Sequence, residues 1–260
     1  MKNLLLIISL LFSSLAFSAP KSELWSYWDQ SNESNSGTIS HATWQQFLDD
    51  YLVIDGQNHL VRYQAVSSND RSQLKQYIGQ LATTDPRQLS RAEQYAYWVN
   101  LYNAVTVELI LDAYPVKSIT KLGGLFSFGP WGDEVVTING KALTLNDIEH
   151  RILRPIWQDP RTHYAVNCAS LGCPNLQTQA FTAENTEALL ERAAHEFVNS
   201  DKGVLVLQNK LQLSSIYDWF IADFGTQAQL IEHLNQYRTQ PLSNVKNIDY
   251  EYDWALNQAK

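Results

Sequence analysis

The sequence predicts a single α+β domain, in which a small, mainly antiparallel sheet is packed by helices around one central buried helix at about residues 91–113. The segment from Tyr95 to Leu111 is apolar on nearly every face, which is typical of a helix buried on all sides. Two hairpin signals, around Asn139-Gly140 and over residues 204–213, indicate antiparallel strands. No linker rich in Pro, Ser or Gly divides the sequence, so we expect one domain.

The first 18 residues have the pattern of a secretory signal peptide. Lys2 precedes an apolar run from Leu4 to Phe12, and small residues follow, among them Ala16 and Ser18. We therefore expect cleavage after Ser18 and export, with the periplasm as the expected compartment. Later segments fall short of the roughly 20 apolar residues that cross a bilayer, so we expect no membrane span in the mature chain.

The first half of the mature chain reads as mainly helical. Residues 19–45 are expected to form an N-terminal extension, and residues 46–260 the domain. The expected elements are short helices at 24–28 and 41–52, a turn or hairpin at 53–63 around Asp55-Gly56, and a helix to about residue 81 opened by Ser68 or Asn69. Ser90 and Glu93 predict a capping box that opens the central helix, which ends before Pro115.

The second half alternates strand and helix signals. Asn139-Gly140 lies between two short β-prone runs at 135–138 and 141–145, as in a tight hairpin with a primed turn. A helix at 146–153, opened by Thr144 or Asn146, carries Glu149 and His150. The remaining expected elements are a strand at 162–167, a helix at 182–199, a hairpin at 204–213, helices at 216–224 and 227–237, and an aromatic, acidic tail at 250–254.

Composition limits the partners. The chain has 19 Lys and Arg residues against 27 Asp and Glu residues, and a formal net charge of −8. This charge disfavours binding to polyanions, so nucleic acid is not an expected partner. The 13 Tyr and 8 Trp residues suit both core edges and pockets for sugars, peptides or lipids, so a small molecule or peptide is the expected ligand. The sequence does not indicate an oligomeric state.

Both cysteines lie in one stretch, Arg161 to Pro174, beside polar residues. A thiol enzyme needs a Cys held as thiolate, an imidazole nearby and a group that orients the imidazole. Cys168, His150 and Glu149 could supply these parts. His163 is a second candidate base, although in a continuous strand it would face away from Cys168.

Other interpretations of the cysteines remain open. In an oxidising compartment Cys168 and Cys173 could form a disulfide that fixes the local turn, or a strained pair that exchanges with other thiols. Zinc bound by His163, Cys168, Cys173 and His150 is a third possibility, but the spacing is unlike that of common zinc sites. We predict no metal and no cofactor.

Two amides and two arginines have a structural and a functional interpretation each. Asn100 and Asn103 share one face of the central helix, where they could anchor a neighbouring loop or form part of a pocket wall. Arg154 and Arg161 could bind a carboxylate or phosphate, or could pair with acidic residues such as Asp147, Glu149 or Asp159.

An ordered series of motifs gives the sequence a family resemblance. The motifs are Tyr97-Trp-Val-Asn-Leu-Tyr-Asn-Ala104, Leu145-Asn-Asp-Ile-Glu-His150 with Arg154, Asp159-Pro-Arg161, His163, Asn167-Cys-Ala-Ser170, Gly172-Cys-Pro174, Trp219, Asp223-Phe224 and Tyr252-Asp-Trp-Ala-Leu-Asn257. With them the chain resembles the domain-of-unknown-function 547 family from about Phe47 to Asn257. The resemblance implies a shared fold and one polar pocket more firmly than it implies an activity.

These observations predict a thiol-dependent hydrolase or acyl transferase that acts on an amide, ester or thioester. Cys168 is the expected nucleophile and His150 the base, with Glu149 and His163 as further catalytic candidates. The expected substrate-binding residues are Asn100, Asn103, Arg154, Arg161, Asn167, Ser170, Trp219 and Asp223. The alternative is a non-catalytic module that binds a peptide, glycan or lipid and is shaped by a Cys168–Cys173 disulfide.

Overall fold

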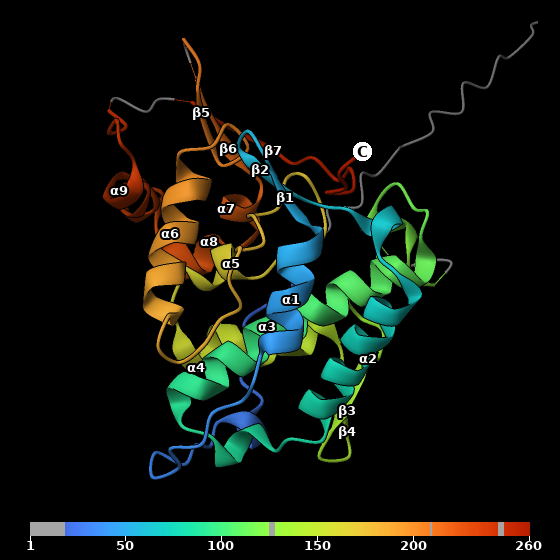
Figure 1. Ribbon diagram of the computed structural model, residues 1–260. Helices are drawn as coiled ribbons and strands as arrows, with labels where there is room; N and C mark the ends of the chain where they lie inside the picture. Colours follow the sequence, from blue (N-terminus) through green and yellow to red (C-terminus); the bar gives the residue numbers. More distant parts are fainter. Residues whose placement is uncertain (1–18, 125–127, 209, 244–246) are drawn as a thin grey trace, which may run out of the picture.

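Helix α3 (Arg91–Ala113) is the central element of the structure, and every residue from Glu93 to Glu108 is buried. The Ser90 side chain accepts a hydrogen bond from the backbone N–H of Glu93 and caps the helix. Only half of the predicted capping box forms, because the Glu93 carboxylate accepts the N–H of Ile39 at 2.6 Å instead. The predicted central buried helix is confirmed (Figure 1).

The computed structural model describes residues 19–124, 128–208, 210–243 and 247–260, so the predicted signal peptide lies outside the described residues. The other helices are α1 (Ala42–Tyr51), α2 (Ser68–Ala82), the π-helix η5 (Asp147–Leu153), α4 (Arg154–Trp157), α5 (Thr162–Ala165), α6 (Thr186–Val198), α7 (Ile216–Trp219), α8 (Ile221–Phe224) and α9 (Gln227–Tyr237). Short 3-10 turns are η1 (Ser26–Trp28), η2 (Tyr63–Ala65), η3 (Pro86–Gln88) and η4 (Ile119–Lys121). The described strands are β1 (Leu52–Asp55), β2 (Asn58–Val61), β3 (Val136–Ile138), β4 (Lys141–Leu143), β5 (Val204–Val206), β6 (Leu211–Ser214) and β7 (Ile248–Glu251).

The strands pair within three small sheets rather than one. The hairpins β1–β2, β3–β4 and β5–β6 are antiparallel, and β7 adds to β6 in parallel. Asn139 and Gly140 have φ angles of 50° and 69°, as a primed turn requires. The α+β class and the hairpins are confirmed, but the single sheet was wrong. The hairpins β1–β2 and β3–β4 each form a two-stranded sheet, whereas β7 extends the hairpin β5–β6 (Figure 1).

The predicted strand at 162–167 is also wrong, because Thr162–Ala165 is the short helix α5. The side chain of Asp159 accepts the backbone N–H of Arg161 at 2.8 Å, and the Asp159 carbonyl accepts the N–H of Thr162 at 3.0 Å. These bonds start a helical turn directly after Pro160. All four residues of α5 are buried, so the alternation of polar and apolar types did not correspond to an exposed and a buried face.

The predicted helix at 146–153 is a π-helix. Thr144 accepts the backbone N–H of Asp147 and fixes its start, as one of the two predicted caps required. The helical path continues through Pro155 into α4, since Pro155 stands in the first turn of α4, where no hydrogen bond is lost. A π-helix has one extra residue per turn, and such segments occur frequently at functional sites.

Two hydrophobic clusters fill the interior. The larger surrounds α3, and the smaller lies among α6, α7, α8, α9 and the β5–β6 hairpin. Trp28, from the predicted N-terminal extension, is 1% exposed and belongs to the larger cluster. In the described ranges, no helix is both long enough and apolar enough to cross a membrane.

Candidate functional site

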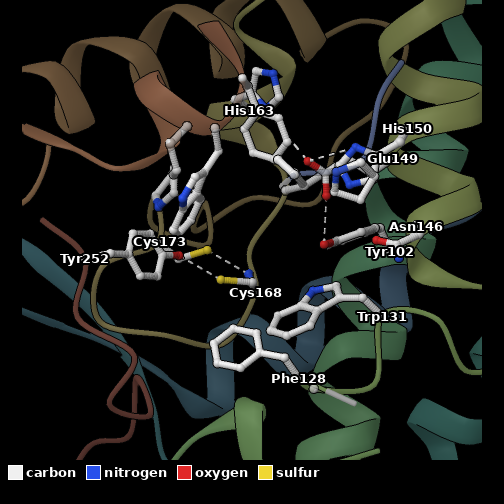
Figure 2. A pocket seen from close by; sticks show the side chains of 18 of the residues that line it. Tyr102, Phe128, Trp131, Asn146, Glu149, His150, His163, Cys168, Cys173 and Tyr252 are labelled. Atoms are coloured by element: carbon white, nitrogen blue, oxygen red, sulfur yellow. Dashed lines mark hydrogen bonds and ion pairs between the residues drawn. The ribbon is translucent and has the colours of Figure 1, made fainter. Parts of the chain in front are cut away.

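A pocket of about 640 Å³ opens where the two hydrophobic clusters meet. Its lining comes from segments far apart in the sequence (Figure 2). The lining residues are Ala19, Pro20, Tyr102, Phe128, Gly129, Trp131, Gly132, Asn146, Glu149, His150, His163, Val166, Cys168, Cys173, Pro174, Ile216, Trp219, Phe220, Tyr252 and Trp254. We call Cys168, Cys173 and Tyr252 the sulfur side, and Glu149, His150, His163, Arg154 and Asp223 the histidine side.

The sulfur side stands on a turn that two asparagines hold. Asn103 donates from its amide to the carbonyl of Ala165 at 2.9 Å and accepts the backbone N–H of Asn167 at 2.8 Å. The Asn167 side chain accepts the N–H of Ala169 at 2.8 Å and donates to the carbonyl of Pro174 at 2.6 Å. These bonds fix the backbone on both sides of Cys168. Asn103 thereby anchors the turn after α5 to helix α3.

The C-terminal tail closes the turn from the other side. Leu171 and Gly172 each donate a backbone N–H to the tail at 2.8 Å, to the carbonyls of Ala255 and Asp253. A Cβ at Gly172 would lie 2.7 Å from the backbone nitrogen of Asp253, so this approach requires glycine. The tail thereby carries Tyr252 to the cysteines.

Both cysteines are free thiols in the structure. The Sγ of Cys168 lies 2.9 Å from the Tyr252 hydroxyl and 3.6 Å from the Ser170 hydroxyl, and the Sγ of Cys173 accepts the backbone N–H of Cys168 at 2.8 Å. Burial tends to raise the pKa of Cys168, but the hydrogen bonds with Cys173, Tyr252 and Ser170 outweigh it and lower the pKa overall. Burial raises the pKa of Cys173 instead, so Cys168 is the thiol that ionises first.

Burial also raises the pKa of Tyr252. Its hydroxyl therefore keeps its proton at neutral pH and can donate to a thiolate. Lys202 attracts the negative charge of the thiolate as well. Its Nζ donates to Asn175 at 2.7 Å, and burial lowers its pKa to about 8 against the attraction of Cys173 and Cys168.

On the histidine side, Glu149 projects from η5 between two aromatic groups. One carboxylate oxygen accepts the Tyr102 hydroxyl at 3.0 Å, and the other lies 3.7 Å from Nδ1 of His163. Burial would raise the pKa of Glu149, but attraction to His150 and pairing with His163 outweigh it and lower the pKa to about 2. Glu149 is therefore an ionised carboxylate at neutral pH.

His163 lies between two carboxylates and against Phe220. Its Nε2 donates to Asp223 at 2.7 Å, and its ring stacks on Phe220 with centroids 4.4 Å apart. Burial opposes protonation, but the bonds to Asp223 and Glu149 outweigh it and raise the pKa of His163. In its protonated form His163 pairs with both carboxylates, and it lines the same pocket as Cys168 because α5 is a helix rather than a strand.

His150 does not fit the predicted role of general base. Its Nδ1 lies 2.9 Å from Nη1 of Arg154, and a guanidinium can only donate, so the ring proton is assigned to Nε2. Burial lowers the pKa of His150 to about 4, which leaves the ring neutral at pH 7. The Nε2–H group makes His150 a hydrogen-bond donor. Glu149 does not orient it either, since its carboxylate lies 3.9 Å from Nδ1.

Both arginines are occupied by protein groups. Arg154 donates to Asp223 at 2.6 Å and to the carbonyl of Pro20 at 3.0 Å, besides its bond to His150. Arg161 pairs with Asp159, as one of the two interpretations required, and with Glu187 and Glu191. Neither guanidinium lines the pocket, so the structure favours their structural roles.

Most of the remaining predicted residues support the pocket from behind. Asn100 exchanges two hydrogen bonds with the backbone of Phe181, at 2.7 and 3.0 Å, and is fully buried. Both α3 amides thus anchor loops, which was the first of their two interpretations. Ser170 contacts Cys168, Asp223 holds His163 and Arg154, and Trp219 lines the pocket itself.

Aromatic residues and Lys202 were missing from the predicted site. Tyr102, Trp131 and Trp254 line the pocket, and Tyr252 contacts the nucleophile candidate. The sequence offered two signals for them, the aromatic loop around Trp131 and the motif Tyr252-Asp-Trp254. Among the described residues, no group of three or more His, Cys, Asp or Glu side chains could hold a metal ion, so the zinc arrangement does not form.

The fold and the pocket define an α+β protein whose aromatic-walled cavity holds a thiol, histidines and a carboxylate. Residues 86–198 match the family model described as "Protein of unknown function, DUF547". The predicted resemblance is confirmed over this segment, which includes Glu149, His150, His163 and both cysteines. It ends before Trp219 and Tyr252, where the resemblance stays a prediction. Comparison with curated proteins and with solved structures found no match.

Proposed function

We propose that the protein is a thiol-dependent acyl-transfer enzyme, a hydrolase or transferase acting on an amide, ester or thioester, with Cys168 as nucleophile. The observation that carries the proposal is the contact of 2.9 Å between Cys168 and Tyr252 at the pocket wall, together with the lowered pKa of Cys168. A thiolate held by a hydroxyl donor in a pocket is the reactive form of cysteine.

In the proposed reaction the Cys168 thiolate forms a bond to the carbonyl carbon, and the bond from that carbon to the alcohol, amine or thiol breaks. The leaving group takes up a proton from solvent. Water or a second nucleophile then attacks the thioester, loses a proton to solvent, and breaks the carbon–sulfur bond, which returns the thiolate. The Nε2–H of His150 is the proposed donor to the carbonyl oxygen, since its Nδ1 is occupied by Arg154.

We also propose that residues 1–18 direct export, on the strength of their sequence pattern. The full chain, expressed with these residues and recovered from a periplasmic fraction, permits one mass-spectrometric experiment. We expect an intact mass that corresponds to a chain starting at Ala19. We also expect iodoacetamide at pH 7 to alkylate Cys168 faster than Cys173. In Cys168→Ala the fast alkylation disappears. Cys173→Ala keeps alkylation at Cys168 but slows it, because this variant loses the Cys173 hydrogen bond that helps to lower the pKa of Cys168.

The rival function is ligand binding without turnover, shaped by a disulfide. The bond between the Cys168 N–H and the Cys173 sulfur brings these residues close enough to make it a real competitor. A quantitative Cys168–Cys173 disulfide that resists mild reductant would overturn the enzyme proposal. Equal alkylation of wild-type protein and Cys168→Ala would overturn it as well.

A further inference from the structure

One wall of the pocket is a continuous aromatic surface, which we call the aromatic wall: Phe128, Trp131, Trp219, Tyr252 and Trp254. Trp254 stacks on Trp219 with centroids 5.6 Å apart, and lies 5.7 Å from Trp131 and 5.1 Å from Phe128. Tyr252 packs against Trp219 at 4.8 Å. Three chain segments thus converge on one apolar face that begins at the sulfur of Cys168.

The described lining offers no free cation to an anionic ligand. Glu149 and protonated His163 face one another at 3.7 Å, and the Cys168 thiolate of the proposed enzyme adds a negative charge. Arg154 lies behind the lining and already binds Asp223, Pro20 and His150. A ligand carboxylate or phosphate would therefore lose its hydration without gaining a cationic partner, which is costly.

The size of the pocket exceeds the need of a small acyl group. A volume of about 640 Å³ lies within the range of pockets that bind drug-sized ligands. The Nε2–H of His150 is the group that we assign as hydrogen-bond donor to a bound molecule, and a single N–H suits one carbonyl oxygen. The rest of the described lining is mostly aromatic and aliphatic, with Asn146 as a further uncharged polar side chain.

We propose that the pocket takes an uncharged acyl compound whose long alkyl or aryl group packs on the aromatic wall, with its carbonyl beside Cys168. This inference names the substrate class of the proposed enzyme and rests on that function. Burying each additional methylene contributes about 0.8 kcal/mol, which corresponds to about a fourfold gain in affinity.

A series of N-substituted maleimides tests the chain-length preference, because each adds the same electrophile to the thiol. N-hexylmaleimide has four more methylenes than N-ethylmaleimide, so we expect the rate of Cys168 labelling, relative to glutathione, to rise at least tenfold between them, and by up to about 250-fold if every methylene is fully buried. 6-Maleimidohexanoic acid, of similar length but anionic, should react at least tenfold more slowly than N-hexylmaleimide. Equal rates for all three reagents, or faster labelling by the acid, would overturn the inference.

Substitution within the aromatic wall should reduce the preference. Trp131→Ala should lower the ratio of N-hexyl to N-ethyl labelling severalfold. Trp157→Ala is the matched control, since Trp157 packs on Tyr95, lies outside the described lining and should leave the ratio unchanged. If both variants keep the wild-type ratio, the wall does not bind the alkyl group.

A binding measurement on Cys168→Ala separates failure of this inference from failure of the enzyme proposal. In calorimetry this variant should bind 2-naphthamide at least tenfold more tightly than 2-naphthoate, with no thiol involved. Amide binding without any labelling of wild-type Cys168 would retain the ligand class and remove the enzyme. Rapid labelling of wild-type Cys168 by N-ethylmaleimide, together with tighter binding of naphthoate than of naphthamide, would retain the enzyme proposal and remove the ligand class.

Discussion

The sulfur side and the histidine side of the pocket are held by different kinds of interaction. On the sulfur side, asparagine amides and the C-terminal tail bind the backbone of the turn that carries Cys168. On the histidine side, Arg154, His163 and the two carboxylates bind one another through side chains. Backbone hydrogen bonds do not titrate near neutral pH, whereas the ion pairs of His163 do, because its pKa is raised from 6.5. The backbone of the sulfur side is therefore fixed by the fold, and the histidine side responds to protonation of His163.

The largest expected effect comes from breaking the sulfur side at Asn103. Asn103→Leu would leave the N–H of Asn167 and the carbonyl of Ala165 without their amide partner in a buried place. Unpaired buried groups cost about 1 to 3 kcal/mol each, so we expect the free energy of unfolding to fall by about 3 kcal/mol. Urea denaturation followed by circular dichroism measures it.

The same helix provides a control. Thr106 is 1% exposed and its hydroxyl has no hydrogen-bond partner among the described residues, so Thr106→Val removes no bond. Its free energy of unfolding should stay within about 0.5 kcal/mol of wild type or rise. A loss of equal size in both variants would show that Asn103 acts through packing alone.

Asn103 also shows how much of this site the sequence could predict. Its position on a helix without a polar face required hydrogen-bonding partners, and local patterns predicted that helix and the hairpin at Asn139-Gly140. The partner of Asn103 lies 64 residues away, and Tyr252 lies 84 residues from Cys168. Contacts at such separations leave no periodicity in the sequence, so Trp219 was the predicted member of the aromatic wall, and its other members and Lys202 were missed.

The error at residues 162–167 has a local cause. The alternating pattern would orient His163 and Tyr164 to opposite faces of a strand, but both side chains are buried in a helical turn. His163 is buried against Phe220 and the carboxylates, and Tyr164 is buried within the smaller hydrophobic cluster. A polar side chain that is buried by its ion partners cannot be told from an exposed one by hydropathy alone.

An intermediate effect is expected from removing one carboxylate on the histidine side. Glu149→Gln leaves Asp223 as the carboxylate partner of His163, so the raised pKa of His163 should fall by about one unit, equivalent to about 1.4 kcal/mol. In the wild type, the stability gained from protonated His163 is complete below its ordinary pKa of 6.5 and is lost as pH rises through the raised pKa. NMR titration of the imidazole measures the shift.

A carboxylate elsewhere serves as the comparison for that substitution. Glu187→Gln changes a surface carboxylate that pairs with Arg161. The pKa of His163 should stay at its wild-type value in this variant. If the pKa of His163 is unchanged in Glu149→Gln as well, Asp223 alone accounts for its elevation.

The smallest expected effect is on the pKa of Cys168 and comes from removing the positive charge of Lys202. Lys202→Met removes a cation that attracts both sulfurs, so the pH midpoint for alkylation of Cys168 by iodoacetamide should rise by up to about one unit. Lys210→Met is the control, because Lys210 is an exposed cation that pairs with Asp249, and it should leave the midpoint unchanged. Equal midpoints in all three proteins would mean that Cys173, Tyr252 and Ser170 hold the thiolate without Lys202. The sulfur side would then depend on hydrogen bonds alone, in full contrast to the histidine side.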